Sequence, residues 1–278
     1  MSNFKELEPH LNQKLQTLKT YLLNLKQICI AFSGGVDSSV LAKAAAETEG
    51  VEAIALCAVS PSMPEREPER IATLAREIGI PLQFVQTDEI SELEYRQNPP
   101  ARCYFCKKHI LQRLLKATQD NKKIALVEGS NADDAFDFRP GAKAVQEFNV
   151  ASPLADAGLT KNEIRQLAHF WGLSVADRPS TPCLSSRIAY GVEITQQRLR
   201  QIDQAENWLA QLGVSPLRVR VFPNDVAVIE SSEQWIEKLA QNDLRKPLTD
   251  YLLSLGFTRA LLSLTEFRSG SMNAGIKK

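Results

Sequence analysis

Apolar residues recur at helical spacing over the first 26 residues, where leucines return every three or four positions (Leu11, Leu15, Leu18, Leu22 and Leu25). This spacing predicts an amphipathic helix. The pattern then changes to short apolar runs separated by longer amphipathic stretches. The runs predict strands at 28–32, 52–59, 82–86 and 124–129, and the stretches predict helices at 38–49, 64–79, 104–119 and 160–171. Strands that alternate with helices predict a doubly wound α/β fold, in which helices cover both faces of a parallel sheet.

The pattern breaks at residues 175–183, where two prolines and an aspartate interrupt the helical periodicity. Beyond the break, the sequence predicts a helix at 195–212, a hairpin that turns at Pro223-Asn224-Asp225, a helix at 232–255 and a strand at 257–264. We therefore expect two domains. Residues 1–178 form the α/β domain, and residues 179–278 form a smaller α+β domain for substrate binding and oligomerisation.

Composition narrows the class of protein. Of the 278 residues, 44% are hydrophobic and 24% are charged, as in ordinary globular proteins. Lys+Arg and Asp+Glu both total 33, so the chain has no overall basic field for nucleic acid. No apolar run approaches the roughly 18 residues of a membrane helix, and the first ten residues lack the apolar core of a signal peptide. We expect a cytoplasmic protein with neither a nucleic-acid nor a membrane partner.

The most informative segment follows the first predicted strand and leads into an Ala-rich helix: Ser33, Gly34, Gly35, Val36, Asp37, Ser38 and Ser39. Glycines let a ligand approach the backbone, and a helix N-terminus offers N–H groups and a positive dipole end. With the serine hydroxyls, the segment is predicted to cradle an anion of pyrophosphate size. No lysine follows the second glycine as it does in a Walker loop, and the adjacent glycines do not match the Gly-x-Gly-x-x-Gly spacing of a dinucleotide motif, so kinase-like and dinucleotide-binding loops are excluded. A Gly-Gly turn before a capped helix is the alternative.

This SGGVDSS segment resembles the signature of the PP-loop ATP pyrophosphatases. Members of that superfamily cleave ATP between the α and β phosphates, adenylate an acceptor oxygen and release pyrophosphate. The resemblance implies ATP and Mg²⁺ as cofactors and Asp37 as a catalytic residue. EGSNADD (128–134) is a second matching segment. It implies that Ser130, Asn131 and Asp134 face the nucleotide, because ligands of doubly wound sheets bind beyond the carboxyl ends of the strands. A polar loop without a ligand is the alternative.

Further motifs resemble the LarE family over almost the whole chain. They are CYFCKKHILQRLL (103–115), FRPGAKA (138–144), RPSTPCLSSRIAYG (178–191), LRVRVFPNDVAVIE (217–230) and FRSGSMN (267–273). LarE proteins insert sulfur into a pyridinium dicarboxylate mononucleotide during synthesis of the nickel-pincer cofactor of lactate racemase. The resemblance implies that ATP adenylates a carboxylate of this small-molecule partner and that a sulfur nucleophile displaces AMP to leave a thiocarboxylate. It also implies a homo-oligomer.

Two arginines are candidates for holding the phosphate of such a substrate. Arg218 and Arg220 alternate along one predicted strand, so both guanidinium groups point to the same face. Their forked geometry suits a phosphate. By the resemblance, they form the phosphate pocket with Ser186, and Arg187 and Arg268 assist. Exposed strand arginines without a ligand are the alternative.

The five cysteines, an odd number, argue against a disulfide framework. Cys29 and Cys57 lie in apolar runs and are predicted to be buried without a chemical role. In the LarE pattern, the cysteine matching Cys183 gives up its sulfur and becomes dehydroalanine. This sequence adds Cys103 and Cys106.

Cys-x-x-Cys with a distant third cysteine can hold three corners of a [4Fe–4S] cluster and leave one iron open for a sulfide. We therefore predict a cluster on Cys103, Cys106 and Cys183, with Cys183 also catalytic and the sulfide donor unidentified. The alternatives are sacrificial donation from Cys183, a zinc site that includes His109, a redox disulfide between Cys103 and Cys106, and unreactive cysteines.

Three rival functions would use the same phosphate loop. A tRNA 2-thiolation enzyme can also hold a cluster on three cysteines, but it needs an RNA-binding surface that the neutral net charge does not indicate. An amide-forming synthetase or an ammonia-dependent ligase has no use for three cysteines in polar surroundings. The third rival is a nucleotide sensor, a binding protein without catalytic activity.

Overall fold

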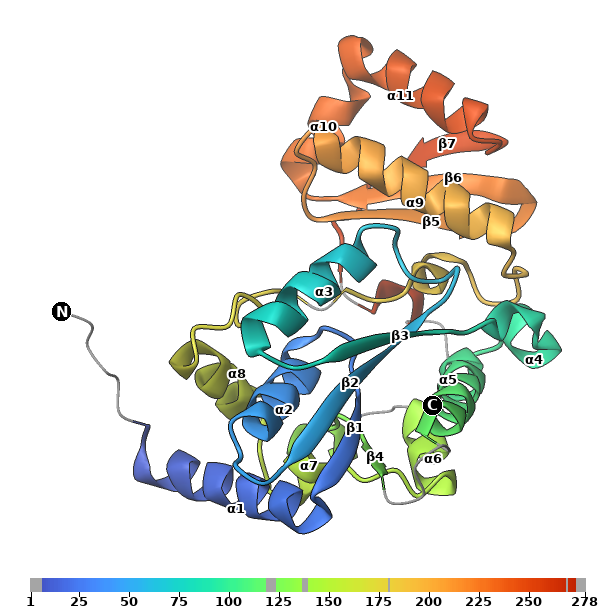
Figure 1. Cartoon of the computed structure of the whole chain (residues 1–278). Helices are drawn as coiled ribbons and strands as arrows, with labels where there is room; N and C mark the ends of the chain where they lie inside the picture. Colours follow the sequence, from blue (N-terminus) through green and yellow to red (C-terminus); the bar gives the residue numbers. More distant parts are fainter. Residues whose placement is uncertain (1–6, 119–123, 137–139, 180, 269, 274–278) are drawn as a thin grey trace. The chain divides into compact units, whose positions relative to one another are not determined.

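A computed structural model of the chain describes residues 7–118, 124–136, 140–179, 181–268 and 270–273 (Figure 1). Parts of three motifs, at positions 138, 139, 180 and 269, lie outside these residues. The chain divides into two compact units. The first comprises residues 1–60, 66–87 and 103–181, and the second comprises residues 61–65, 88–102 and 182–278. Two short segments from the N-terminal half of the sequence therefore belong to the second unit.

The first unit contains a four-stranded, all-parallel sheet with the strand order β3-β2-β1-β4. Within it, Ile30 of β1 pairs with Ala55 of β2 on one side and with Val127 of β4 on the other. Each strand matches one expected from the apolar runs, which confirms the parallel α/β fold. The strands are β1 (Gln27–Ala31), β2 (Glu52–Val59), β3 (Leu82–Gln86) and β4 (Ala125–Val127).

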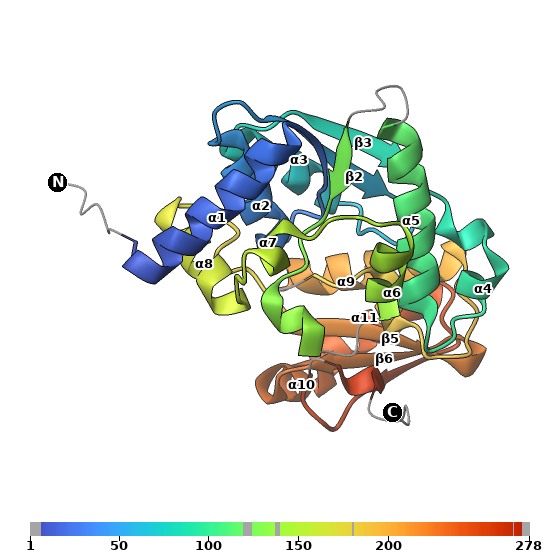
Figure 2. The same cartoon turned by 90° about the horizontal axis from the view of Figure 1, so that it is seen from below.

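Helices cover both faces of this sheet, as the doubly wound prediction requires (Figure 2). α5 and α6 pack against the face that presents Cys29, Leu56 and Leu126, and α2, α3 and α8 lie on the opposite side. The predicted leucine face of the first helix is buried at its first four positions. The helices are α1 (Pro9–Leu25), α2 (Val36–Ala46), α3 (Glu67–Ile78), α5 (Arg102–Thr118), α6 (Pro140–Glu147), α7 (Pro153–Asp156) and α8 (Lys161–Phe170).

The second unit contains a three-stranded mixed sheet with the order β5-β6-β7. The predicted hairpin is confirmed, because β5 and β6 pair antiparallel and β7 adds parallel to β6. Asn224 and Asp225 in the turn adopt left-handed φ values of 62° and 55°, which asparagine and aspartate tolerate better than most residues. The elements are α4 (Leu93–Arg96), α9 (Gln196–Gln211), β5 (Leu217–Phe222), β6 (Val226–Ser231), α10 (Glu233–Ala240), α11 (Asn242–Ser254) and β7 (Arg259–Leu262).

The single helix predicted at 232–255 is wrong, because two helices occupy this segment. Gln241 between them has extended backbone (φ −68°, ψ 150°) and ends α10. In a continuous helix, Leu239 and Leu248 would lie on opposite faces, since nine residues at about 100° each give a rotation near 180°. The break allows both leucines to be buried. Among the described helices, none is both long and apolar enough to cross a membrane.

Candidate active site

The carboxyl ends of β1 and β4 meet where the strand order reverses. From β1 the chain continues to β2 on one side, whereas β4 lies on the other side of β1. In open α/β sheets, ligands bind in the crevice at such a reversal. Residues 33–39 follow β1 and residues 128–134 follow β4. The topology therefore brings together the two segments predicted to bind ATP.

The first of these segments makes a tight turn into α2. Gly34 has a left-handed φ of 68°, and a Cβ there would lie 2.6 Å from Cγ1 of Ile71, so the position requires glycine. Gly35 is the N-cap of α2, and no side chain among the described residues caps this end. The first-turn N–H groups, which include those of Val36 and Asp37, are therefore available to an anion.

The three serines of the loop stabilise its shape. The hydroxyls of Ser38 and Ser39 donate to the carbonyl of Gly35 at 3.1 and 2.8 Å, and Oγ of Ser33 lies 3.3 Å from Oγ of Ser38. Ser38 and Ser39 are buried, whereas Ser33 is exposed. Of the three hydroxyls, that of Ser33 is the one open to a ligand.

Gly129 brings the segment after β4 into contact with α2. A Cβ at this position would lie 2.9 Å from the backbone nitrogen of Ser38 and 3.2 Å from its Cα. Backbone atoms cannot rotate away as a flexible side chain can, so only glycine fits. Sequence reasoning did not single out Gly129, although it lies in the EGSNADD motif.

Asp37 is the point where the two segments touch. The side-chain amide of Asn131 donates to Oδ1 of Asp37 at 3.2 Å, and Nζ of Lys161 forms an ion pair with Oδ2. Asp134 holds the turn by accepting from the backbone N–H of Asn131 at 3.1 Å. Asn131 of the second predicted segment thus contacts the carboxylate of the first.

Lys161 was not predicted as a site residue. It is the first residue of α8, directly after the N-cap Thr160, which forms a capping box with Glu163. The Thr-x-x-Glu pattern was visible in the sequence and predicts a helix start. The pattern does not reveal that this helix start lies beside Asp37.

Buried Glu128 holds the segment after β4 in place. Its carboxylate accepts from the backbone N–H of Ser130 at 2.9 Å, the hydroxyl of Ser152 at 2.8 Å and Nζ of Lys107 at 3.1 Å. Burial raises the pKa of Glu128, but Lys107 and the two serines outweigh this effect and lower the pKa. Glu128 therefore stays ionised, and Lys107 links α5 to the carboxyl end of β4.

Cys103 and Cys106 lie in the first turn and a half of α5. Because α5 is the crossover from β3 to β4, it begins at the carboxyl edge of the sheet, the edge at which residues 33–39 lie. The two thiols are three residues apart and share one face of the helix. Cys103 is exposed and Cys106 is partly buried.

The remaining two cysteines of the first unit are buried, as predicted. Burial raises the pKa of Cys29 to about 11 and that of Cys57 to about 12. Both side chains therefore stay protonated thiols at neutral pH.

Cys183 lies in the second unit and is fixed through its backbone. Arg187 is 2% exposed and donates to the carbonyl of Cys183 at 3.0 Å and to that of Pro182 at 2.6 Å. The same guanidinium forms a forked ion pair with Glu206 at 3.1 and 3.0 Å. The hydroxyl of Ser186 also donates to the Cys183 carbonyl, at 2.7 Å. Most Arg187 donors are thus used inside the protein, and its predicted assistance at a substrate phosphate stays a prediction.

Residues 88–102 brace the same segment, and sequence reasoning missed them. Asn98 is fully buried, and its side-chain amide donates to the carbonyls of Ile188, Ala189 and Val192 at 2.8 to 3.2 Å. Arg102 donates to the Asn98 side chain at 2.8 Å and to the carbonyl of Ser185 at 2.9 Å. These contacts fix the backbone that follows Cys183.

Arg218 and Arg220 differ in how many of their donors the protein uses. Arg220 is 5% exposed and donates to Glu230 at 3.0 Å, to the carbonyl of Ser186 at 2.9 Å and to Oγ of Ser271 at 3.2 Å. Arg218 donates to its neighbour's carbonyl, at 2.6 Å, and stacks over the ring of Phe267. Burial lowers the pKa of Arg218, and the nearby Arg187 and Arg220 lower it further. An anion beside Arg218 would relieve this repulsion.

Comparison with known proteins assigns the family. The PP-loop domain matches residues 7–102. A pyridinium-3,5-bisthiocarboxylic acid mononucleotide synthase of Lactiplantibacillus plantarum is 35% identical over 267 residues, which cover 95% of each chain. The chain belongs to the LarE family of PP-loop ATP pyrophosphatases. An uncharacterised protein of Synechocystis sp. is 39% identical over 96% of this chain and all of its own length. One of Methanocaldococcus jannaschii is 30% identical over 88% of this chain and 92% of its own.

As a LarE-family member with a PP-loop domain, the protein is an ATP-dependent sulfurtransferase. Its three cysteines in polar surroundings are divided between the two units, with Cys103 and Cys106 in the first and Cys183 in the second. Within the described residues, no three His, Cys, Asp or Glu side chains form a group that could hold a metal ion. The cluster on these cysteines therefore stays a prediction.

The environments of the two strand arginines predict different outcomes for their alanine variants in this LarE-family chain. Arg220→Ala leaves the carboxylate of Glu230, which is 14% exposed, without its ion-pair partner, so we expect it to lower the free energy of unfolding by about 3 kcal/mol. Arg218→Ala should leave stability nearly unchanged and weaken substrate binding by about 1.5–3 kcal/mol, the usual contribution of a hydrogen bond to a charged group.

Urea unfolding and calorimetric titration with the substrate mononucleotide measure these two effects. Arg200, which is exposed on α9, offers a control, because Arg200→Ala removes a charge without breaking an ion pair among the described residues. Equal losses of substrate affinity and ATP affinity in Arg218→Ala would contradict the assignment of this arginine.

Proposed function

We propose that this enzyme adenylates a carboxylate of a pyridinium-3,5-dicarboxylate mononucleotide and converts it to a thiocarboxylate, with AMP and pyrophosphate as the other products. One observation carries the proposal: the PP-loop and the segment after β4 meet around Asp37 at the reversal of the sheet. The name of the L. plantarum relative, which matches 95% of the chain, supports the choice of substrate.

The first turn of α2 supplies the donors for the ATP phosphates. Its N–H groups and the positive end of the helix dipole stabilise the polyphosphate. Asp37 and the side-chain oxygen of Asn131 are hard oxygen donors of the kind that Mg²⁺ prefers, so these residues fit a magnesium–ATP complex. The ammonium of Lys161 beside Asp37 adds a positive charge close to the departing pyrophosphate.

The substrate phosphate is assigned to the second unit. Arg218, Arg220 and Ser186 form its pocket in this proposal, and Arg268 assists from the segment after β7. The three guanidinium groups of Arg187, Arg218 and Arg220 exceed the two carboxylates of Glu206 and Glu230 by one positive charge. That surplus favours a phosphate monoester.

The sulfur source is assigned to Cys103, Cys106 and Cys183 as ligands of a [4Fe–4S] cluster. The one-turn spacing of Cys103 and Cys106 and the positive N-terminal end of α5 suit two anionic ligands of one metal centre. Such a cluster supplies an open iron that can carry an additional sulfide, which an outside donor replenishes. We further propose that the enzyme acts in the cytoplasm as a homo-oligomer. Exposed Leu261 on the edge strand β7 and the nearby exposed Leu264 support an interface in the second unit.

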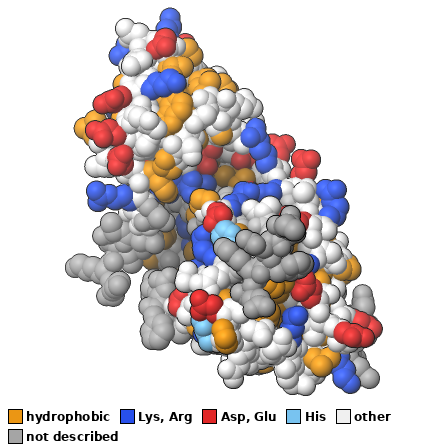
Figure 3. Space-filling model, turned by 90° about the vertical axis from the view of Figure 1, so that its left-hand side faces the viewer, with side chains coloured by type: hydrophobic (Ala, Val, Ile, Leu, Met, Phe, Trp, Pro, Cys, Tyr) orange, Lys and Arg blue, Asp and Glu red, His pale blue; other side chains and the backbone are white. Residues whose placement is uncertain are grey.

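Sacrificial donation from Cys183 is the second candidate, and one observation favours it: Cys183 lies in a different unit from the other two cysteines. A tRNA 2-thiolation activity is less well supported. On the face seen in Figure 3, acidic side chains are interspersed with basic ones rather than excluded from a basic track. A continuous basic surface is what binding to an RNA backbone requires.

The test is to measure the amounts of all three products that protein purified without oxygen forms. Protein supplied with Mg²⁺, ATP, sulfide and the pyridinium dicarboxylate mononucleotide should form AMP, pyrophosphate and thiocarboxylate in equal amounts. It should contain about four irons per chain. A parallel reaction with bulk tRNA should form no thiolated nucleoside. Formation of ADP and orthophosphate would overturn the PP-loop assignment, and thiolated tRNA would overturn the substrate.

A further inference from the structure

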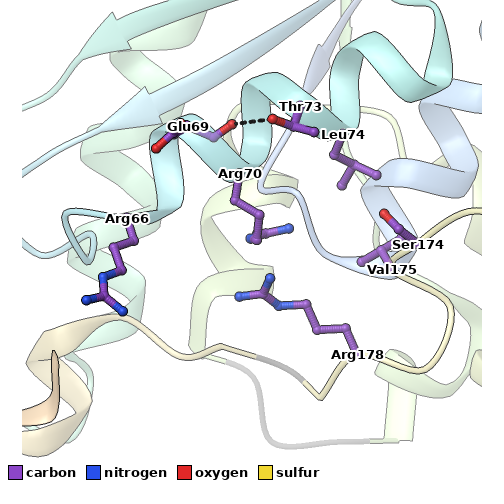
Figure 4. A pocket seen from close by; sticks show the side chains of 8 residues that line it. All are labelled: Arg66, Glu69, Arg70, Thr73, Leu74, Ser174, Val175 and Arg178. Carbon is purple, nitrogen blue, oxygen red and sulfur yellow. Dashed lines mark hydrogen bonds between the residues drawn. The ribbon is translucent and has the colours of Figure 1, made fainter. Parts of the chain in front are cut away.

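A cavity rich in arginine lies in the first unit, between α3 and the chain after α8 (Figure 4). Its volume is about 340 Å³, within the range of small-molecule sites. Arg66 and Arg70 line it from the N-terminal end of α3, and Arg178 lines it from the segment after α8. None of these arginines was singled out as a site residue from the sequence.

The arginines of this cavity outnumber the carboxylates beside them. Glu67 is shared, because its Oε2 accepts from Nε of Arg70 at 2.8 Å and its Oε1 accepts from Nη2 of Arg178 at 2.7 Å. Arg66 forms no ion pair with any described residue. Glu69 also lines the cavity. Three guanidinium charges against two carboxylates therefore leave one net positive charge.

Arg70 and Arg178 also keep guanidinium N–H groups that no described residue accepts. A guanidinium carries five N–H groups. Arg70 uses two on Glu67 and one on the carbonyl of Gly34, at 3.1 Å. In Figure 4, the guanidinium groups of Arg70 and Arg178 face each other across the cavity. Glu67 already bridges these two groups, and an anion bound on the cavity side would accept from N–H groups that Glu67 does not use.

Arg70 connects the cavity to the phosphate loop. The same guanidinium that faces the cavity donates to the backbone carbonyl of Gly34, the second residue of the loop. Arg70 Nη2 also lies 2.9 Å from the position a Cβ of Gly34 would occupy. The guanidinium group of Arg70 would therefore contact both a ligand in the cavity and the loop that holds the ATP phosphates.

We propose that this cavity is a second oxyanion site, separate from the PP-loop, which binds inorganic pyrophosphate. The volume admits a diphosphate together with water, and the three forked guanidinium groups offer donors to both of its phosphate groups. The site would receive pyrophosphate as it leaves the PP-loop. The release of pyrophosphate at the PP-loop rests on the proposed function, whereas the binding of pyrophosphate in the cavity does not.

Calorimetric titration with inorganic pyrophosphate tests the site while the PP-loop is blocked. The full chain is first saturated with Mg²⁺ and α,β-methylene-ATP, which cannot be cleaved between the α and β phosphates. We expect one further equivalent of pyrophosphate to bind. Arg66→Gln should weaken this binding about ten-fold, and the Arg66→Gln/Arg178→Gln double variant should reduce it at least a hundred-fold. Neither should change the affinity for the ATP analogue by more than about two-fold.

Arg76→Gln is the matched control, because Arg76 lies on the same helix, is exposed and does not line the cavity. It should bind pyrophosphate like the unaltered chain. Thermal melting of every variant shows whether the fold persists. The proposal is overturned if no pyrophosphate binds beside the analogue, or if the cavity variants bind it as tightly as Arg76→Gln. Failure of the ATP analogue to bind, with pyrophosphate binding still dependent on Arg66, would instead overturn the proposed function alone.

Discussion

Asp37→Asn should reduce the formation of AMP and pyrophosphate by at least about a hundred-fold, the usual effect of removing one group that stabilises a transition state. Asparagine keeps the shape of the side chain and an oxygen for the amide of Asn131. It removes the negative charge that pairs with Lys161 and suits a magnesium ion. Release of labelled pyrophosphate from ATP in the presence of substrate measures the change.

Glu49→Gln provides the matched control for this charge change. Glu49 is exposed beyond the far end of α2, so the variant loses one carboxylate charge without touching the phosphate loop. Its activity should stay within about two-fold of the unaltered enzyme, as expected of an exposed side chain remote from the chemistry. If Asp37→Asn retained full activity, the carboxylate would have no part in ATP cleavage and the site would have to be reassigned.

Loss of Cys183 should abolish thiocarboxylate formation and leave intact the adenylation step, in which ATP and substrate form the acyl-adenylate and release pyrophosphate. Both sulfur mechanisms predict this result, because each requires the Cys183 sulfur. Cys103→Ala and Cys106→Ala separate the two. If the three cysteines hold a cluster, each of these variants should lose most of its iron and, in the same proportion, its sulfur transfer. Iron content, visible absorbance and the mass of the thiolated product are the measurements.

The matched control for the cysteine series is Cys29→Ala. This thiol is buried in the sheet, where burial raises its pKa to about 11, so its loss should change neither iron content nor sulfur transfer. A colourless protein that needs Cys183 but not Cys103 or Cys106, and that shows dehydroalanine at position 183 after one turnover, would establish sacrificial donation instead.

Sequence reasoning succeeded where the determining residues are neighbours in the chain. Each strand of the parallel sheet appeared as an apolar run, and the phosphate loop appeared as seven consecutive residues. The hairpin of the second unit was visible for the same reason, because its turn residues stand between two alternating strands. Asn131, which the sequence predicts to face the nucleotide, lies beside Asp37 at the carboxyl edge of the strands, where ligands of parallel sheets gather. Its contact with the nucleotide stays a prediction.

The same reasoning failed where the partners are distant in sequence. Lys161 lies 124 positions from Asp37, and Asn98 lies at least 90 positions from the carbonyl groups that it binds. No local periodicity reports such pairs. The helix predicted at 232–255 failed for a related reason: the break at Gln241 exists because leucines on opposite helix faces both pack inside the fold.

The bracing of the Cys183 segment by residues 88–102 bears on how this protein can be divided and recombined. Asn98 and Arg102 belong to the second unit, but the ribosome makes them before β4 of the first. Their hydrogen-bonding partners at 185–192 emerge only after the first unit is complete, so the second unit cannot finish folding as an independent C-terminal module. A fragment starting at residue 182 would leave the carbonyls of Ile188, Ala189 and Val192 without the amide that binds them. Exchange of the second unit between relatives therefore requires that residues 88–102 move together with the C-terminal segment.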